Sequence, residues 1–330
     1  MKDILNRLIN HETISKEEAK NVLVNISKGQ YNTSQIAAFL TVYMMRSITI
    51  EELEGFRNAL LDLCIAIDLK EYNTIDLCGT GGDGKDTFNI STLASFVSAG
   101  AGIKIAKHGN YGVSSKCGSS NVMEYLGIKF SNNKDFLKKT IEEAGICILH
   151  APLFHPAMKN VAPIRKELGV KTFFNMLGPM VNPAFPQNQM VGVFNLELAR
   201  MYGYLYQNTD KNYTILHALD GYDEISLTGT TKVIRNHSEQ MITANDFGVA
   251  QHLQSDIVGG DSIEESAKIF MNVLSGKGTE PQNNVVCANA GMAIATVKGF
   301  SPKEGFELAK ESLLSGRGLK SLNKLQELSK

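Results

Sequence analysis

Glycines and hydroxyl side chains crowd residues 76–92, DLCGTGGDGKDTFNIST, and such loops can bind phosphate through their backbone N–H groups. Gly79, Gly81 and Gly84 form G-x-G-x-x-G, but the polar KDTFN that follows delays the helix, and the next strand ends in lysine instead of the acidic residue of a dinucleotide site. Residues 79–85 form G-x4-G-K, yet aspartate follows where a P-loop needs Ser or Thr. The segment therefore indicates either a different anion site or an ordinary tight turn before a helix.

A second segment of the same character is residues 107–127, KHGNYGVSSKCGSSNVMEYLG, which is rich in small, hydroxylated and basic residues before an expected helix. The two segments follow successive predicted strands, so in a parallel sheet both open at the carboxyl edge, where ligands of such folds bind. One turn of this kind can be purely structural. Two adjacent ones predict a large polyanionic ligand.

These motifs in order, GTGGD, NIST, and KHGN followed by SS and GS, resemble the anthranilate phosphoribosyltransferases, which are related to pyrimidine nucleoside phosphorylases. The resemblance continues through HPAMKNVAPIRKELG, FNMLGPMVNP, DGYDEIS and GGDSIEESAKIFMNVLSG, and spans nearly the whole chain. It implies an enzyme of tryptophan biosynthesis that transfers the phosphoribosyl group of phosphoribosyl pyrophosphate (PRPP) to the amine of anthranilate and releases pyrophosphate.

The resemblance also assigns ligand contacts residue by residue. For PRPP it implies Gly79, Gly82, Asp83, Thr87, Asn89, Ser91, Thr92, Lys107 and Ser119. For anthranilate it implies Gly79, His108, Asn110, His155 and Arg165. Backbone amides, hydroxyls and a lysine suit a phosphate and a pyrophosphate, and a planar guanidinium suits the anthranilate carboxylate bidentately.

Asp223 and Glu224 in DGYDEIS are the obvious carboxylate pair. A turn rich in Gly and Asp usually carries solvated acids, but pyrophosphate chemistry needs Mg2+, which prefers one or two carboxylates with substrate oxygens and water. The resemblance implies that Asp223, Glu224 and Ser91 ligate Mg2+. Because an aniline-type amine is already nucleophilic at neutral pH, we expect no dedicated catalytic residue, and catalysis by positioning and electrostatics.

Four positions depart from the usual pattern of the family. Tyr111 stands where an arginine is usual, Ser120 and Asn121 replace Ala-Asp, and Lys171 replaces a common arginine. The second segment therefore carries one cation fewer than its relatives usually do.

The amino-terminal part, residues 1 to about 70, is predicted to be a small helical domain. Two capping boxes, Ser15-x-x-Glu18 and Thr49-x-x-Glu52, precede apolar residues at helical spacing. Between them SQIAAFLTVYMMRS is apolar nearly all round, which predicts a helix buried on several sides.

Residues 71–330 are predicted to form a larger α/β domain. The apolar runs TIDLC, GIKIAK, ICILHA, QMVGVFN and YTILHAL alternate with helical patterns, which predicts a mostly parallel sheet flanked by helices. Residues 224–243 have no helical period and predict a short antiparallel insertion. Arg165 is expected on a helix that begins near Pro156.

The resemblance implies that residues about 165–185 return to the helical domain and that this domain forms a homodimer interface. Within that stretch FNMLGPMVNP contains Gly-Pro and Asn-Pro steps, which break regular elements and predict a hinge or crossing segment.

The composition narrows the partners and the compartment. With 33 Lys and Arg against 34 Asp and Glu, the net charge of −1 gives no broad footprint for nucleic acid or an anionic membrane. The five scattered cysteines contain no C-x-x-C pair, which argues against a zinc site or a disulfide framework. No signal-peptide core or membrane-length apolar run is present in the sequence, so we expect a cytoplasmic protein.

Two alternatives remain at this point. A pyrimidine nucleoside phosphorylase would share the architecture and the glycine loops, but it needs no arginine for an aromatic carboxylate. A non-catalytic nucleic-acid-binding relative should carry a basic stripe and lack the acidic pair. Arg165 in its motif, the balanced charge, and Asp223 with Glu224 argue against both.

Overall fold

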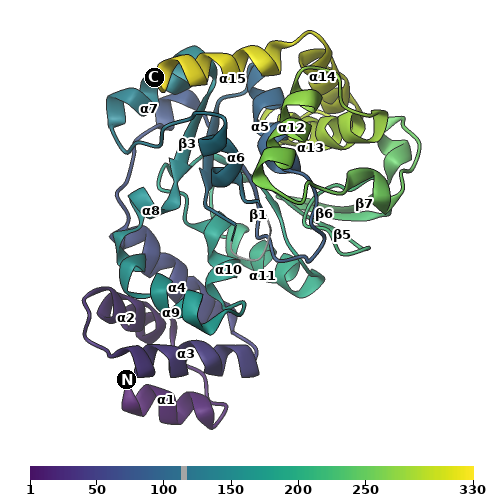
Figure 1. Cartoon of the computed structure of the whole chain (residues 1–330). Helices are drawn as coiled ribbons and strands as arrows, with labels where there is room; N and C mark the ends of the chain where they lie inside the picture. Colours follow the sequence, from purple (N-terminus) through teal and green to yellow (C-terminus); the bar gives the residue numbers. More distant parts are fainter. Residues whose placement is uncertain (113–116) are drawn as a thin grey trace.

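The computed structural model describes residues 1–112 and 117–330, so the SS of the second motif, at 114–115, lies outside the described residues. The amino-terminal helices are α1 (Lys2–Ile9), α2 (Lys16–Ser27), α3 (Thr33–Met45) and α4 (Ile50–Leu63). They gather at the end of the molecule that carries the amino terminus, below the sheet in Figure 1.

Both predicted capping boxes are present. The Ser15 hydroxyl accepts the N–H of Glu18 at 3.2 Å, and the Glu18 carboxylate accepts the N–H of Ser15 at 2.9 Å. Thr49 and Glu52 make the same reciprocal pair at the start of α4, with distances of 3.2 and 2.9 Å. Each box satisfies two N–H groups that a helix start leaves without partners, which is why the helices begin there.

A seven-stranded sheet forms the other layer. Its strands are β1 (Ile75–Gly79), β2 (Ile105–Gly109), β3 (Ile146–His150), β4 (Asn188–Gly192), β5 (Asn212–Ala218), β6 (Thr231–Arg235) and β7 (Ser238–Ile242), in the spatial order β3-β2-β1-β4-β5-β6-β7. Strands β1 to β5 run parallel, and β6 and β7 are antiparallel. The predicted α/β class, mostly parallel sheet and antiparallel insertion are confirmed.

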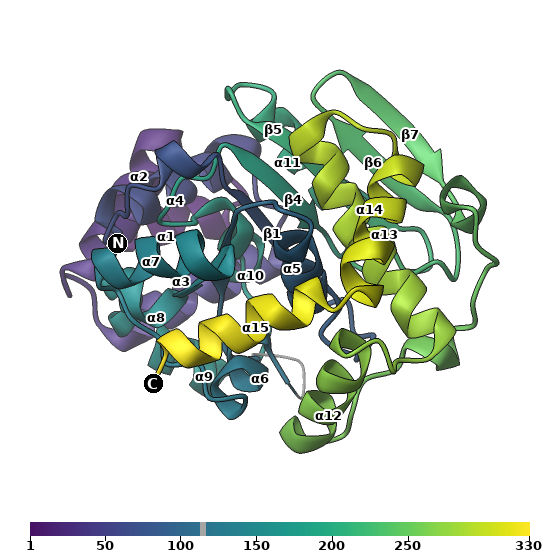
Figure 2. The same ribbon diagram turned by 90° about the horizontal axis from the view of Figure 1, so that it is seen from above.

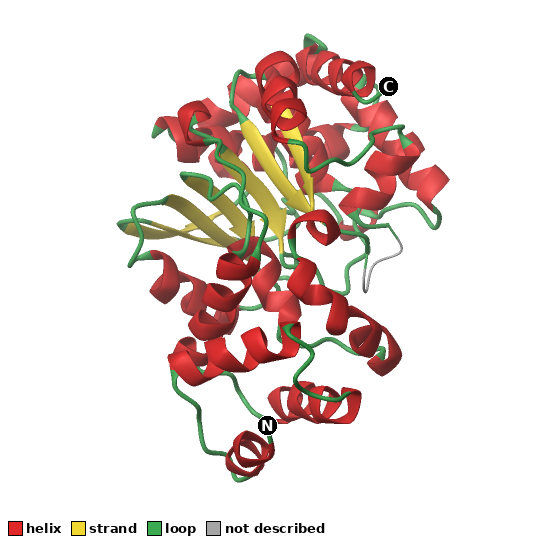
Figure 3. Ribbon diagram, turned by 90° about the vertical axis from the view of Figure 1, so that its left-hand side faces the viewer, coloured by secondary structure: helices red, strands yellow, loops and turns green. Residues whose placement is uncertain are grey.

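Helices cover both faces of this sheet, as Figure 3 shows. Alternate strand residues divide between two cores: Leu77 and Leu216 lie with α5 and α13, whereas Tyr213 and Ile215 lie with α11 and the amino-terminal helices. The helices of this part are α5 (Ile90–Gly100), α6 (Ser119–Tyr125), α7 (Lys134–Ala144), α8 (Ala151–Phe154), α9 (Ala162–Leu168), α10 (Phe174–Leu177), α11 (Leu196–Tyr206), α12 (Ile263–Leu274), α13 (Glu280–Lys298), α14 (Pro302–Leu314) and α15 (Arg317–Leu328).

The carboxyl-terminal helix α15 closes the top of the α/β layer. Seen from above, it crosses the molecule from the side of α14 toward α7 (Figure 2). The Ser321 hydroxyl donates to the carbonyl of Ala144, the last residue of α7, at 2.5 Å. The end of the chain is thereby fixed to an element some 180 residues earlier.

The segment that follows α9 packs into the core of the amino-terminal helices. The ring of Phe173 stacks on Phe56 with centroids 4.4 Å apart, and makes edge contacts with Tyr43 at 5.3 Å and Phe39 at 6.0 Å. A chain segment from beyond residue 160 thus completes the core of helices formed before residue 64.

The helix expected from Pro156 is wrong in its extent. Pro156–Asn160 is a 3-10 turn, and Arg165 lies on the separate helix α9. Pro163 has no N–H to donate four residues back and its ring would clash with that carbonyl, so one continuous α-helix cannot pass through it. Among the described residues, no helix combines the length and apolarity needed to cross a membrane.

Candidate active site

A cavity of about 430 Å3 opens at the carboxyl ends of β1 and β2, beside the turn that follows β5. It is lined by every predicted contact residue except His155: Gly79, Gly82, Asp83, Thr87, Asn89, Ser91, Thr92, Lys107, His108, Asn110, Ser119, Arg165, Asp223 and Glu224. His155 lies directly behind, with its ring centroid 5.2 Å from that of His108. The fold therefore brings residues from four separate parts of the sequence to one place.

The first wall of the cavity is the glycine loop after β1. Gly81, Gly82 and Gly84 have φ values of +64°, +77° and +73°, which side chains other than glycine seldom adopt. A Cβ on Gly79 would lie 2.2 Å from Oδ2 of Asp223. The glycines therefore let the loop turn sharply and let the acidic turn approach its backbone.

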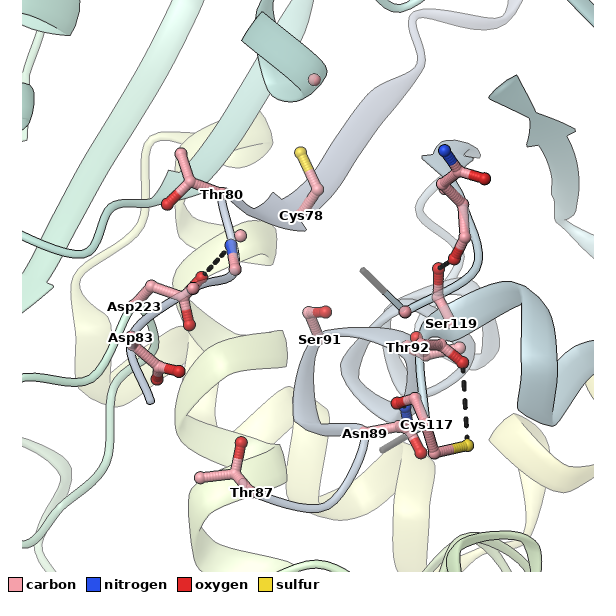
Figure 4. A pocket seen from close by; sticks show the side chains of 18 of the residues that line it. Cys78, Thr80, Asp83, Thr87, Asn89, Ser91, Thr92, Cys117, Ser119 and Asp223 are labelled. Carbon is pink, nitrogen blue, oxygen red and sulfur yellow. Dashed lines mark hydrogen bonds between the residues drawn. The ribbon is translucent and has the colours of Figure 1, made fainter. Parts of the chain in front are cut away.

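The acidic pair is held by this loop and by the start of α5. Gly81 N–H donates to Oδ2 of Asp223 at 2.7 Å, and Ser91 N–H donates to Oε1 of Glu224 at 3.1 Å. Figure 4 shows Asp83 and Asp223 together on one side of the pocket, Asn89, Cys117 and Ser119 on the other, and Ser91 between them. The N–H groups that suit an anion thus face two carboxylates of the same pocket.

Burial and mutual repulsion raise the pKa of both carboxyl groups of the pair. Burial, with the neighbouring charge of Asp83, raises the pKa of Asp223 to about 7. Burial, with the charges of Asp223 and Asp83, raises the pKa of Glu224 well above its ordinary value. A cation placed beside Asp223 and Glu224 would relieve their repulsion and favour their charged forms.

The donor set suits Mg2+ better than a metal held by protein alone. In the described parts of the chain, no three His, Cys, Asp or Glu side chains are arranged so that they could hold a metal ion by themselves. Asp83 nevertheless has a buried Oδ2 without a hydrogen-bond partner, beside Asp223. Mg2+ commonly takes one or two carboxylates and completes its octahedron with water and phosphate oxygens, so these residues fit it.

The second wall is the segment after β2. Asn89 Nδ2 donates to the carbonyl of Cys117 at 3.1 Å, which ties the first loop directly to the second. Lys107 is buried, and its Nζ donates to the carbonyl of Leu77 at 2.6 Å. Burial lowers the pKa of Lys107, while the nearby carboxyl group of Asp76 opposes this shift.

Tyr111, which replaces a usual arginine, braces this segment from outside. Its hydroxyl lies 3.3 Å from both carboxylate oxygens of Glu124, and its ring packs edge-on against His150 at 4.8 Å. His150 in turn stacks on Phe130 at 4.4 Å and bonds Ser120 through Nδ1 at 2.9 Å. The substitution exchanges a cation for a packed aromatic anchor.

The third wall comes from α9, α10 and the segment between them, which carries Lys171; the cation on α9 is Arg165. Its Nη2 donates to Oδ1 of Asn175 at 3.2 Å, its guanidinium lies over the Phe174 ring at 5.3 Å, and its buried Nε has no partner. Burial lowers the pKa of Arg165. A half-buried guanidinium without a carboxylate partner is suited to bind an anionic group of a ligand.

His108 lines the same cavity as Arg165, and His155 packs against the His108 ring from behind. Burial lowers the pKa of His108 to about 4 and that of His155 to about 3, so both rings are neutral at physiological pH. His108 bonds the carbonyl of Gly178 through Nδ1 at 3.1 Å, whereas its Nε2 and both ring nitrogens of His155 have no partner. The part of the cavity beside Arg165 and His108, the recess, therefore offers one cation and several unused neutral polar atoms.

Reasoning from the sequence missed Asn175 of this pocket and Asp76 below it, and it noted Lys171 only as a replacement for a common arginine, without placing it in the pocket. Asn175 orients Arg165, and Lys171 Nζ donates across the pocket to the carbonyl of Gly82. Beneath them the fully buried Asp76 accepts the N–H of His108 at 3.1 Å. Polar residues inside otherwise apolar runs, FFNML and TIDLC, were the available signal.

Comparison with known proteins agrees with this geometry. Residues 2–64 match the model of the glycosyl transferase family helical bundle domain, and residues 71–319 match that of the glycosyl transferase family a/b domain. A protein of Flavobacterium johnsoniae named anthranilate phosphoribosyltransferase is 78% identical over 329 residues, covering 100% of both chains. This chain belongs to the anthranilate phosphoribosyltransferase family.

Solved structures of anthranilate phosphoribosyltransferases share the fold. The enzyme of Thermus thermophilus is 32% identical, with a TM-score of 0.91 and 99% of each chain covered. The Saccharomyces cerevisiae enzyme in complex with PRPP and Mg is 29% identical, with a TM-score of 0.91 over 99% of this chain and 97% of the other. The predicted fold class and family are confirmed, and the two alternative families are set aside.

Proposed function

We propose that this chain is an Mg2+-dependent phosphoribosyltransferase that joins anthranilate to PRPP, forming N-(5-phosphoribosyl)anthranilate and pyrophosphate. One observation carries the proposal: in a chain of this family, a single pocket unites two glycine-rich loops, an acidic pair and Arg165. The first three features suit a phosphorylated sugar with its metal, and the guanidinium suits an aromatic carboxylate.

PRPP is assigned to the two loops. Gly79, Gly82, Asp83, Thr87, Asn89, Ser91, Thr92, Lys107 and Ser119 are the proposed contacts, and all of them line the cavity. The N–H groups at the start of α5 point a partial positive charge at this space, which favours phosphate. The hydrogen bond from Asn89 to Cys117 supports binding of PRPP by both loops together.

Asp223, Glu224 and Ser91 would hold Mg2+. The crowding of Asp83, Asp223 and Glu224 supports this assignment, because a cation there offsets their repulsion. When bound, Mg2+ supplies charge neutralisation for the pyrophosphate leaving group. The yeast relative, whose complex contains both PRPP and Mg, makes the same cofactor reasonable for this chain.

Anthranilate is assigned to Gly79, His108, Asn110, His155 and Arg165. Arg165 binds the carboxylate, while the neutral rings of His108 and His155 can accept hydrogen bonds from the amine. A yeast relative's complex with 4-fluoroanthranilate supports an aromatic acid in this family. Catalysis then consists of holding the amine near C1 of the ribose, away from water, with no covalent enzyme intermediate.

We also propose that residues 1–70, joined by about 165–185, form one domain, and that 71–330 form the other. The packing of Phe173 among aromatic side chains of α3 and α4 supports the return of the later segment. The helical domain is the proposed homodimer interface. Ile9 on α1 and Met45 on α3 are 61% and 79% exposed, apolar area that a second subunit could cover.

The test mixes purified protein with anthranilate and PRPP and follows the loss of anthranilate fluorescence, with Mg2+ present or chelated. We expect a loss of signal that requires both PRPP and Mg2+. Asp223→Asn should raise the Mg2+ concentration needed, because it removes a charged ligand. Binding of PRPP without consumption of anthranilate would show that the acceptor is a different molecule.

A further inference from the structure

Asn121, in the first turn of α6, holds the two ends of the second loop together. Its Oδ1 accepts the N–H of Gly112 at 2.9 Å and the N–H of Gly118 at 3.0 Å. These two glycines stand on either side of residues 113–116. A single side-chain oxygen therefore closes the base of the loop.

The two ends of the loop also touch through their backbones. A Cβ on Gly118 would lie 2.2 Å from the nitrogen of Gly112, so only glycine fits there. The N–H of Ser120 donates to the carbonyl of Asn110 at 3.1 Å. We call this closure, formed by residues 110–112 and 118–121, the neck.

The neck sets the position of the cavity wall. Asn110, Tyr111 and Gly112 from one side of it, and Gly118 and Ser119 from the other, line the cavity. On its carboxyl-terminal side, Gly118 directly follows Cys117, whose carbonyl accepts a hydrogen bond from Asn89 of the first loop. A change in the neck is therefore transmitted to both loops.

Asn121 itself does not line the cavity. Its amide oxygen satisfies two backbone N–H groups that would otherwise compete for other partners, and each such bond is worth roughly 1 kcal/mol. A carboxylate at this position could accept the same two bonds, whereas alanine could accept neither.

We propose that Asn121 is a positioning residue for PRPP, acting through the neck and not by contact with the substrate. This inference rests on the proposed function of the pocket. It predicts that loss of the neck bonds weakens PRPP binding much more than it slows the chemical step, because the neck carries Ser119 and adjoins the bond from Asn89 to Cys117, both on the PRPP side. Asn110 is the only proposed anthranilate contact in the neck, and Arg165 on α9 lies outside it.

The test compares Asn121→Ala with Asn121→Asp and with Asn133→Ala. Asn133 is the matched control, since its Oδ1 accepts the N–H of Phe136 at the start of α7, and it is exposed and does not line the cavity. PRPP binding is measured by titration calorimetry with Mg2+ and without anthranilate, and KM and kcat are measured separately. Exchange of the Gly112 and Gly118 amide protons is followed by NMR with 15N-glycine.

We expect Asn121→Ala to raise the Kd and KM for PRPP about tenfold or more, with kcat within about threefold. Its Gly112 and Gly118 amides should exchange faster, and Asn121→Asp should restore both properties. Should Asn121→Ala not fold, Asn121→Ser replaces it with the same expectations, because its shorter side chain cannot reach both N–H groups.

If Asn121→Ala bound PRPP as tightly as Asn133→Ala does, the positioning role of Asn121 would be overturned. The proposed function would remain intact. Unchanged glycine exchange would overturn the neck itself. If the unmodified protein bound no PRPP, the proposed function would fail, and the inference would fail with it.

Discussion

At the scale of single residues, the pocket has a cation on one wall and acidic groups on the opposite wall, and burial shifts the pKa of groups on both walls. Arg165 is the cation of the aromatic-acid recess, and the two histidines beside it are kept neutral. On the opposite wall, Asp83, Asp223 and Glu224 crowd together. In the proposed function, the recess binds the anionic acceptor and the acidic wall binds a cation, so that two substrates are oriented without any nucleophilic side chain.

Arg165→Lys should not act as a conservative change. A lysine keeps the charge but loses the planar fork that can bind a carboxylate through two hydrogen bonds. We expect the KM for anthranilate to rise about 10- to 100-fold, equivalent to about 1.4–2.8 kcal/mol, with little change in the KM for PRPP. Steady-state kinetics with each substrate varied will measure this.

The matched control for that change is Arg57→Lys. Arg57 bonds Glu54 and Asn58 within α4 and does not line the cavity. Equal effects of the two substitutions on anthranilate binding would contradict the assignment of Arg165.

The burial of His155 should make stability depend on pH. Its pKa is lowered from 6.5 to about 3 in the folded protein, so below pH 6.5 the unfolded chain binds a proton that the folded chain does not. The contribution to stability is complete above the unfolded pKa and is lost as the pH falls, by about 1.4 kcal/mol per pH unit. At pH 5 the loss is about 2 kcal/mol.

His155→Gln removes this titration. Urea unfolding at pH 7.5 and pH 5 should show that the unmodified protein loses about 2 kcal/mol more than the variant between these two values. Parallel pH dependence in both proteins would show that His155 is solvated in the folded state.

At the scale of elements, the site depends on how closely the acidic turn approaches β1 and β4. A Cβ on Gly192, the last residue of β4, would lie 1.4 Å from the backbone oxygen of Asp223. A Cβ on Gly79, at the end of β1, would likewise be too close to Asp223, at 2.2 Å from its Oδ2. Two strand ends are thus kept free of side chains so that the turn after β5 can lie against them.

Gly192→Ala should therefore displace Asp223 and Glu224. We expect activity at a fixed, low Mg2+ concentration to fall at least about tenfold, and stability to fall by about 1–3 kcal/mol because of overpacking. Kinetics across a range of Mg2+ concentrations and urea unfolding will measure the two effects.

Gly203→Ala on α11 is the control. The nearest atom to its Cβ would be Cγ2 of Ile234 at 3.9 Å, an ordinary contact, and alanine favours a helix over glycine by about 0.5–1 kcal/mol. If Gly192→Ala kept full activity at low Mg2+ concentration, the acidic turn would tolerate the added methyl group without displacing Asp223 and Glu224, and the prediction would be wrong.

At the scale of the whole molecule, the helical layer has two roles. On its inner side, α9 and α10 line the cavity, and α4 packs with them in a common core. On its outer side, α1 and α3 leave apolar side chains exposed, the largest fraction being the 79% of Met45. One face completes the site, and the other is the proposed dimer contact.

We expect light scattering on a sizing column to give about twice the mass of one chain for the unmodified protein. The double variant Ile9→Glu with Met45→Glu should give the mass of one chain, because buried carboxylates at a subunit contact cost several kcal/mol. Met241→Glu is the control. Met241 is 54% exposed on β7, the last strand at one edge of the sheet, and Figure 1 shows this strand well apart from α1 and α3. A single-chain mass for the unmodified protein would refute the dimer.

Much of the fold could be predicted because its signals are local. The Ser15 and Thr49 caps and the Ser301-Pro302 start of α14 all depend on bonds within four residues. The break before α9 was missed, although Pro163 signalled it, because the HPAM motif suggested one continuous helix.

By itself, the sequence determined the two layers, the strand positions, the family, and the identity of the groups that chemistry needs. Only the tertiary structure decided how those groups meet. The contact from Gly81 to Asp223 spans 142 residues, and the contact from Ser91 to Glu224 spans 133. Caps and periodic burial are fixed by neighbours along the chain, whereas these contacts exist only because parallel strands bring distant loops to one edge of the sheet.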